Sequence, residues 1–372
     1  MSSRMSLKFE LLSVCNFGCP DFQLPRFSLF FICINPKTMS FPLHKLPASA
    51  ILQVLQLMDI YDQLTYSLCS KNTKKMVKSL GLRATTIQVH VQKKIGICIN
   101  FDNSNYNFFW SSFEHGYYFP DEEFRIPWYI EAVAWNNVKK ETEWKWYGAN
   151  IGIREYLHHF IDVLQHTRID DLNFNDELVN ADIIVPVQKV LKGLQILELG
   201  LVNSITNEFS RSALESFHYY DEFYLERIPF ERHEVGRMNK IFMKNLWWGL
   251  VSEPGKITID QLLISNWVEI QLNITDLTEK DFNILLKLWI KGSSPRLTYF
   301  YATTFHLLDQ KIILKGINCS QIPLDNEEVH IRKIDVHYQE TTLAGGSRIK
   351  RFDGTTAVVV IDEAEFKIIV DI

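Results

Sequence analysis

The stretch that decides the fold lies near the N-terminus, at residues 41–80, and reads FPLHKLPASAILQVLQLMDIYDQLTYSLCSKNTKKMVKSL. Proline at a first helical position costs little, because its missing N–H would be unpaired there anyway, so Leu46-Pro47 predicts a helix start. Apolar residues then recur at three- and four-residue spacing, as on one face of a helix: Ile51, Val54, Leu55 and Met58. The pattern predicts a short amphipathic helix.

Two further short helices are predicted in the same stretch. Turn-type residues at 58–62 end the first helix, and Asp62 is the expected N-cap of the second. A strongly basic helix is predicted from Thr73 to Leu80, and Gly81 is placed to end it. The second helix has an apolar set of its own, formed by Leu64, Leu68 and Cys69. So small a unit has too much surface for its volume to bury all these groups, so some are expected to face another surface.

This pattern resembles the F-box, the helical hook that docks substrate receptors onto the Skp linker subunit of Skp–cullin–F-box ubiquitin ligases. The resemblance rests on Leu46-Pro47, Ile51, Leu55, the turn and restart from Asp59 to Leu64, and Leu68-Cys69-Ser70-Lys71. The fragments FPLHKLP, LMD, SLCSKNTKKMVKSL and the later WIKGSSPRL are further similar to nematode F-box proteins with a type 2 F-box-associated domain. The resemblance implies a set of residues that contact the Skp subunit, some of which must instead close the core of the hook: Leu46, Pro47, Ile51, Leu55, Leu64, Leu68 and Cys69.

One departure from the family pattern keeps two other interpretations open. Many F-boxes carry a tryptophan after the Cys-Lys run, whereas this chain has Ser70-Lys71-Asn72-Thr73, so part of the usual contact set is missing. Residues 41–80 would then be an ordinary helical hairpin packed inside a larger domain. Alternatively, the chain is a protein-interaction module that no longer associates with a ligase and keeps the hook as structure.

Composition restricts the classes of partner. The net charge of −5 over 372 residues argues against a protein that binds nucleic acid by neutralising phosphates over a broad surface. The 6 cysteines are scattered, which suits a reducing compartment better than a disulfide framework. No segment reaches the about 18–20 apolar residues that span a bilayer. We therefore expect a cytoplasmic or nuclear protein that binds neither nucleic acid nor membrane.

The chain is expected to divide into five parts. Residues 1–38, which precede a plausible second start at Met39, are predicted to be a disordered N-terminal extension, and residues 41–82 are the F-box. Residues 83–165 are predicted to be a β-rich connecting region that ends in a helix. A leucine-rich-repeat-like region is predicted from 166 to 305, and the resemblance places the type 2 F-box-associated segment within it, at 256–303. Residues 306–372 form a C-terminal β region.

Short strands and helices are expected to alternate in the repeat region. The predicted strands are 169–174, 194–201, 256–263, 268–274 and 297–301, and the clearest helix is Glu279–Lys291. Residues 209–245 interrupt this pattern and are predicted to be a long loop or an inserted helix. Leu343–Ser347 is predicted to be a flexible connection, and Asp353-Gly354 a hairpin turn. The fold class is therefore α+β or α/β, with a three-helix hook followed by a β-rich, leucine-rich-repeat-like sheet-and-helix domain.

The sequence holds no motif that predicts catalysis. The phosphate loop GxxxxGK[ST] and the nucleophile elbow GxSxG are both absent. His158 and His159 are adjacent, so on a helix they diverge by about 100° and cannot share a metal. We expect a non-enzymatic adaptor without cofactors that binds a Skp-type subunit through the F-box and an unknown target protein through its C-terminal domain. An unrecognised hydrolase or transferase is the alternative from a different class.

Overall fold

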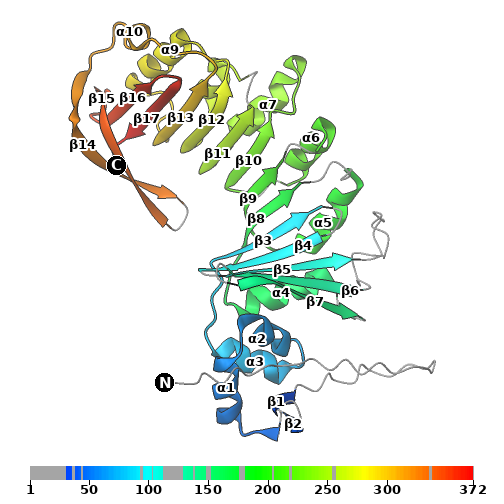
Figure 1. Ribbon diagram of the computed structural model, residues 1–372. Coiled ribbons are helices and arrows are strands. Elements are labelled where there is room, and N and C mark those ends of the chain that lie inside the picture. Colours follow the sequence, from blue (N-terminus) through cyan, green and yellow to red (C-terminus); the bar gives the residue numbers. More distant parts are fainter. Residues whose placement is uncertain are drawn as a thin grey trace. The chain divides into compact units, whose positions relative to one another are not determined.

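The computed structural model describes residues 31–35, 38–42, 45–92, 95–102, 104–111, 129–136, 139–147, 152–175, 181–202, 205–217, 220–253, 257–334 and 337–371 (Figure 1). These residues fall into two compact units. One takes the described residues within 1–87, 97–114 and 122–168, and the other takes those within 88–96 and 169–372. Helices at 48–79 precede a large β-rich region, so the predicted mixture of helix and sheet is confirmed at this level.

The first unit begins with a hairpin and three helices. Strands β1 (Phe31–Asn35) and β2 (Thr38–Pro42) pair antiparallel. The helices of the hook are α1 (Ala48–Leu57), α2 (Ile60–Ser67) and α3 (Lys71–Ser79). Gly81 ends the third helix as predicted, with a φ of 72°, a backbone conformation that glycine adopts without steric cost. The predicted disorder of the extension stays a prediction, because residues 1–30 lie outside the described part of the chain.

The rest of the described first unit is β-rich and ends in a helix. Its strands are β4 (Ile95–Phe101), β5 (Ser104–Ser111), β6 (Tyr129–Asn136) and β7 (Lys139–Tyr147), and its helix is α4 (Ile153–Val163). Strands β5, β6 and β7 pair antiparallel. The ring of Phe108 on β5 packs against Phe160 on α4 at 4.9 Å between centroids, so the buried face of the helix closes the core of this unit.

The second unit is built on a parallel sheet. Strand β3 (Thr86–Val91) pairs with β8 (Ile169–Phe174), and each strand from β8 to β13 runs parallel to the next. The further strands are β9 (Ile196–Leu201), β10 (Glu222–Arg227), β11 (Trp248–Glu253), β12 (Glu269–Thr275) and β13 (Tyr299–Thr304). The helices between them are α5 (Ile184–Leu191), α6 (Asn207–Ser216), α7 (Val235–Phe242), α8 (Ile259–Ile264) and α9 (Glu279–Ile290), with 3-10 turns η2 (Ala181–Ile183) and η3 (Arg232–Glu234) before α5 and α7.

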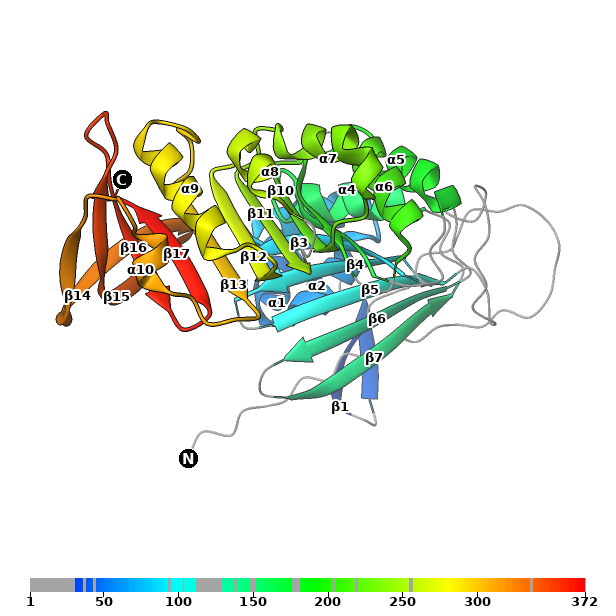
Figure 2. The same cartoon turned by 90° about the horizontal axis from the view of Figure 1, so that it is seen from above.

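Helices α5 to α9 cover one face of this parallel sheet (Figures 1 and 2). Side chains alternate along each strand, so every second residue faces the helices. These residues form a fully buried core together with the largest side chains of the region: Leu172, Leu199, Phe223, Leu272, Phe300, Trp267 and Trp289. Gly249 lies directly beneath Trp267, where an added Cβ would approach the ring to 2.8 Å. The glycine therefore makes room for the indole in this core.

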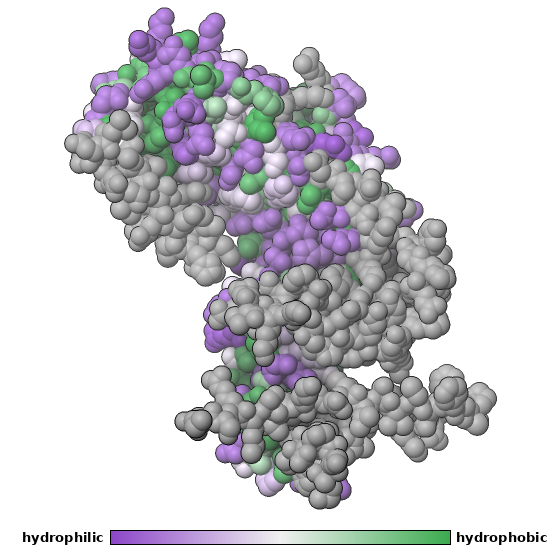
Figure 3. Space-filling model, viewed as in Figure 1, coloured by the Kyte–Doolittle hydropathy of each residue, from purple (hydrophilic) through white to green (hydrophobic). Residues whose placement is uncertain are grey.

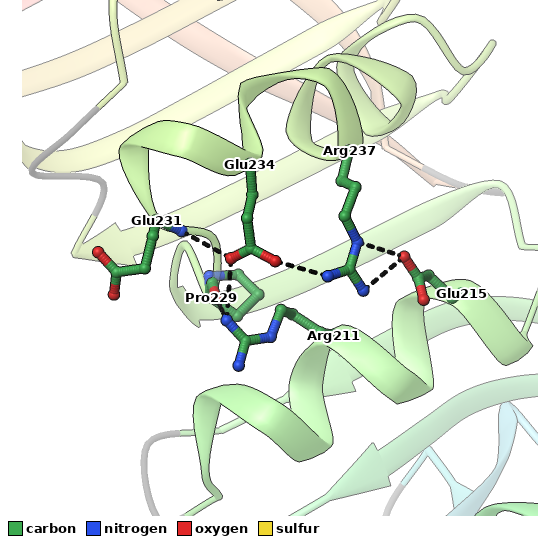
Figure 4. Close-up of polar contacts among 6 residues, drawn as sticks. All are labelled: Arg211, Glu215, Pro229, Glu231, Glu234 and Arg237. Atoms are coloured by element: carbon green, nitrogen blue, oxygen red, sulfur yellow. Dashed lines mark hydrogen bonds and ion pairs between the residues drawn. The ribbon is translucent and has the colours of Figure 1, made fainter.

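A polar network joins two of these helices at their outer surface (Figure 4). The carboxylate of Glu234 accepts hydrogen bonds from Arg211 of α6 at 2.9 Å and from Arg237 of α7 at 2.5 Å. Arg237 also donates to Glu215 of α6 at 2.7 Å. The backbone N–H of Glu231 completes the set by donating to Glu234. Two arginines that bridge two carboxylates, Glu215 and Glu234, hold the start of α7 against α6.

The chain ends in an antiparallel extension of the sheet. After the short helix α10 (Gln310–Ile313), the strands are β14 (Ser320–Ile334), β15 (His337–Lys350), β16 (Thr356–Asp362) and β17 (Glu365–Val370). They follow β13 in the order β17, β16, β15, β14, each antiparallel to its neighbour. The predicted turn at Asp353-Gly354 joins β15 to β16, and Gly354 has a φ of 98°. Strands β14 to β17 make this end of the sheet antiparallel.

Three predictions of local structure were wrong. Residues 256–263 were predicted to be a strand, whereas α8 begins there under a capping box formed by Thr258 and Gln261. The interruption at 209–245 instead holds part of α6, all of β10 and α7, and is followed by β11. The predicted flexible connection at Leu343–Ser347 lies inside β15, where Gly345 and Gly346 both have positive φ.

Candidate functional site

The candidate site is the three-helix hook, and its first helix separates buried from exposed apolar groups. Pro47 is the N-cap of α1, so the helix starts one residue later than predicted. Ile51 and Leu55 are 4% and 0% exposed and form the inner face of α1. Leu57, at the last position of the helix, is 74% exposed. A partner that docks on α1 would therefore meet Leu57 rather than the inner stripe.

The turn between α1 and α2 is fixed by two polar side chains. Asp59 is the N-cap of α2 and its carboxylate accepts a hydrogen bond from the backbone N–H of Asp62 at 2.8 Å, so the predicted cap at Asp62 was one turn too late. The buried amide of Gln63 donates to the backbone carbonyls of Leu55 at 2.7 Å and Met58 at 2.9 Å. These carbonyls lie at the end of α1, where helical partners run out. Gln63 thereby holds the two helices at a set angle.

Burial raises the pKa of two side chains in and directly after α2. Burial, with the neighbouring charge of Asp59, raises the pKa of Asp62 to about 7. Burial alone raises the pKa of the Cys69 thiol to about 11, so this group stays a protonated thiol at neutral pH. Its sulfur lies 3.7 Å from the carbonyl of Thr65. Cys69 is therefore suited to packing and not to nucleophilic chemistry.

Helix α3 begins at a capping box and carries the basic face. Ser70 accepts from the backbone N–H of Thr73, whose hydroxyl in turn lies 2.9 Å from the N–H of Ser70. Lys74 and Lys78 both pair with Asp162 of α4, at 2.7 and 2.6 Å. Their hydrogen bonds lower the pKa of Asp162 to about 2. Two of the four lysines of this basic face therefore form ion pairs within the chain, whereas Lys71 and Lys75 are exposed.

The predicted contact residues divide into two groups. Ile51, Leu55 and Leu64 are buried inside the hook. The others are exposed or partly exposed and lie before α1 and at the junction of α2 and α3: Leu46, Pro47, Leu68 and Cys69. The sequence analysis did not single out Leu57, although its position opposite Ile51 and Leu55 on the helical wheel was the available signal.

Nothing in the described part of the chain gathers into a metal site. No group of three or more His, Cys, Asp or Glu side chains with ligand geometry occurs among the described residues. Glu155 and His159 share a face of α4, but His159 is engaged with Ser67 of the hook. Among the same residues, none of the helices has the length and apolar character needed to cross a membrane.

Comparison with known proteins agrees with this geometry. The chain matches the F-box domain over residues 43–85 and the F-box associated domain over residues 237–302. It is also similar to the F-box associated domain-containing protein sdz-33 of Caenorhabditis elegans, with 24% identity over 271 residues that cover 71% of this chain and 79% of that protein. No solved structure matches the chain.

The chain therefore contains an F-box followed by an F-box-associated domain, and the resemblance found in the sequence is confirmed. The second match begins earlier than the predicted segment at 256–303, since it takes in most of α7 and all of β11. Proteins with this pair of domains are typically adaptors without catalytic activity, and the two domains suggest a substrate adaptor of a Skp–cullin–F-box ubiquitin ligase.

Proposed function

We propose that this protein is a substrate-recognition adaptor of a Skp–cullin–F-box ubiquitin ligase, acting in the cytoplasm or nucleus. The F-box holds the chain on a Skp-type linker subunit, and the sheet domain holds a target protein. Such an adaptor does no chemistry itself. It raises the effective concentration of target lysines near a separately supplied conjugating enzyme.

The observation that carries the proposal is the exposed apolar side of a hook whose core is already closed. Ile51, Leu55 and Leu64 are buried without any partner, so the hook folds around them within this chain. Leu57 and Pro47 are left on the surface of the same small unit. A leucine that is 74% exposed gains about 1.5–3 kcal/mol when a partner covers it fully. We therefore assign the docking contacts to Leu46, Pro47, Leu57, Leu68 and Cys69, with the buried three shaping the surface.

The domain limits given by the sequence are part of the proposal. Residues 41–82 form the docking module and 83–165 connect it to the repeat region at 166–305, with 306–372 closing the sheet. We propose that the repeat region is leucine-rich-repeat-like. Support comes from the parallel pairing of β8 to β13 with a helix after most strands, the arrangement in which repeats stack through nearest neighbours.

The test is co-expression with a Skp-type subunit and capture through a tag on this chain. Replacing Pro47 by Ala and Leu57 by Asp should reduce recovery of the Skp subunit at least tenfold, because a charge would be buried at the interface. Leu307→Asp is the matched control, since Leu307 is also a leucine that is 74% exposed but lies in the other unit. Equal recovery with both variants would place the docking surface elsewhere.

The structure also changes which variant is informative. Replacing Pro47 and Ile51 together by Ala is the natural choice from the sequence. Ile51 is only 4% exposed, however, so its truncation leaves a cavity and costs about 2–5 kcal/mol of stability. Loss of binding by that variant would not separate unfolding from loss of contact. The exposed position Leu57 avoids this ambiguity.

The alternative function is a protein-interaction module that no longer associates with a ligase. It is favoured by the absence of the tryptophan that many F-boxes carry after the Cys-Lys run, where this chain has Asn72 and Thr73. A folded chain that recovers no Skp subunit under any condition would support this alternative.

A further inference from the structure

One face of the parallel sheet of the second unit is covered by none of the helices in the described part of the chain (Figures 1 and 2). Side chains that alternate with the buried core point to this face. Pairing between strands places one residue of each strand in a single row across it. From β8 to β13 this row reads Asp171, Glu198, Glu222, Trp248, Glu269 and Tyr299. We call this helix-free face, defined by that row and its flanking positions on β8–β13, the open face.

Three carboxyl groups stand side by side at one end of the row. Asp171 is the register partner of Glu198, which is the partner of Glu222, and neighbouring strands lie about 4.8 Å apart. Like charges placed directly opposite one another on a sheet repel. Burial, together with the charges of Asp171 and Glu222, accordingly raises the pKa of Glu198 to about 8. This end of the row is therefore an arrangement that a positive charge would stabilise.

The contacts of Asp171 show how this charge is held. One carboxylate oxygen accepts hydrogen bonds from Asn173 at 2.6 Å and from Gln88 at 3.3 Å, both of them neutral amides. The other oxygen, Oδ1, is shielded from solvent and accepts no hydrogen bond from the described residues. Amide donors fix the orientation of the side chain without neutralising it.

The next positions on the open face continue the same chemistry. Alternate positions of β8 to β12 lie on this face, and of these five are acidic and none is Lys or Arg: Asp171, Glu198, Glu222, Glu226 and the buried Glu269. Tyr224 is held by hydrogen bonds that join its hydroxyl to Glu226 and to Ser252, each at 3.2 Å. Trp248 lies beside Glu222 in the row and is half-buried. Acidic and aromatic groups are thus adjacent on one surface.

The far end of the sheet differs in character. Tyr299 packs with Val358 and Ile369 in an apolar cluster of the antiparallel extension. Figure 3 shows the same division, with hydrophobic residues gathered over β16 and β17 and hydrophilic residues further along the sheet. The acidic positions therefore belong to the strands from β8 to β12, and the extension bounds them on one side.

We propose that the open face binds an extended segment of a partner protein that carries Lys or Arg side chains at alternate positions, followed by an apolar side chain. Same-face side chains in an extended chain repeat every 6.5–7 Å, roughly, so two long basic side chains fit within the about 10 Å from Asp171 to Glu222. The apolar side chain would lie on Trp248, since aromatic side chains are the commonest anchors of protein interfaces. This inference rests on the proposed function, for which it names the target-binding surface.

The test uses the full chain and fluorescent peptides. One peptide carries arginine at alternate positions followed by a tyrosine, and its control has citrulline, a neutral isostere, in place of each arginine. We expect fluorescence anisotropy to show binding of the arginine peptide at least tenfold tighter than the citrulline peptide, with the difference falling as NaCl is raised. The variant carrying Glu198→Gln and Glu222→Gln should bind the arginine peptide at least tenfold more weakly.

A matched control keeps the outcome interpretable. The variant carrying Glu208→Gln and Asp260→Asn loses the same number of carboxyl groups from exposed positions on α6 and α8, on the helical side of the sheet, and should bind as the unaltered chain does. Glu198→Gln alone replaces a buried carboxyl group by an amide of the same size and is expected to remain folded, which guards against a variant that fails only by unfolding.

Three results would overturn the proposal. The first is equal binding of the arginine and citrulline peptides, and the second is equal loss of binding in the two double variants. The third is a dimer of this chain that Glu198→Gln with Glu222→Gln dissolves, because a second copy would then occupy the open face. Recovery of the Skp subunit should be unchanged in all these variants, so failure here is distinguishable from failure of the proposed function.

Discussion

The side-chain hydroxyl of Ser67, at the end of α2, lies 2.7 Å from Nε2 of His159 on α4. The same hydroxyl donates its hydrogen to the carbonyl of Leu64 at 2.5 Å, so the imidazole must be the donor in the contact with Ser67. With the pairs from Lys74 and Lys78 to Asp162, this bond fastens the F-box helices to α4 at three points. The three-helix hook is therefore packed against α4 of the same unit and is not connected to it through a linker alone.

This contact predicts a pH dependence of stability. Burial, and the nearby charge of Lys74, lower the pKa of His159 to about 4 from an ordinary 6.5. Between these values the unfolded chain binds more protons than the folded chain, so stability should fall as the pH is lowered from about 6.5 to 4. His159→Gln, which keeps a donor and cannot titrate, should remove about 1–3 kcal/mol of that loss in urea unfolding. An unchanged pH profile in the variant would contradict the assigned contact.

A second pH dependence of opposite sign is expected from the open face. The pKa of Glu198 is raised to about 8 by burial and by Asp171 and Glu222, above the 4.5 of an ordinary glutamate. The folded chain then binds more protons, so stability should fall as the pH rises from about 4.5 to 8. Glu198→Gln should be nearly neutral at pH 4.5 and stabilising by about 1–3 kcal/mol above pH 8. If the variant were destabilising at pH 8, Glu198 would have a positive partner in the folded chain.

The core of the helix-covered sheet predicts a large effect at Trp289. Its side chain is fully buried on the inner face of α9, and Arg351 lies over its ring at 5.3 Å. Trp289→Ala should cost about 3–5 kcal/mol in urea unfolding, because it leaves a large cavity in a closed core. Leu307→Ala, at a position 74% exposed, serves as the control and should cost well under that amount. Comparable costs for the two variants would mean that α9 does not seal the sheet.

Much of this fold was accessible from the sequence, and the reasons are local. Strand β8 begins and ends as predicted, because its apolar residues are bounded by polar residues on both sides. Helix α9 begins at Glu279 as predicted, directly after its N-cap Thr278. The residues of the capping box, Thr278 and Asp281, belong to a polar cluster that precedes an apolar stripe in the sequence. The three F-box helices were found for the same reason, with an error of one turn in the cap at Asp59.

The incorrect predictions have physical causes that the sequence of one segment does not reveal. Strand β10 reads EFYLER, and its alternate polar residues lie on the open face. Because of these charged residues, the segment resembled a loop in the sequence. Strand β11 contains Gly249, whose place in a strand follows only from the approach of Trp267 from another element. Gly346 in β15 similarly has a φ of 123° and faces Val358 of the neighbouring strand. Which F-box residues are buried likewise depended on packing between helices.

The adaptor function requires that the folded full chain bind a Skp-type linker subunit. Isothermal titration of the purified chain with that subunit measures this without a target protein. We expect one saturable site with a Kd of about 1 μM or tighter, lost in Leu57→Asp and kept in Leu307→Asp, both variants having unchanged circular dichroism. Absence of binding by the folded, unaltered chain would contradict the proposed adaptor function. It would support the alternative, a protein-interaction module that no longer associates with a ligase.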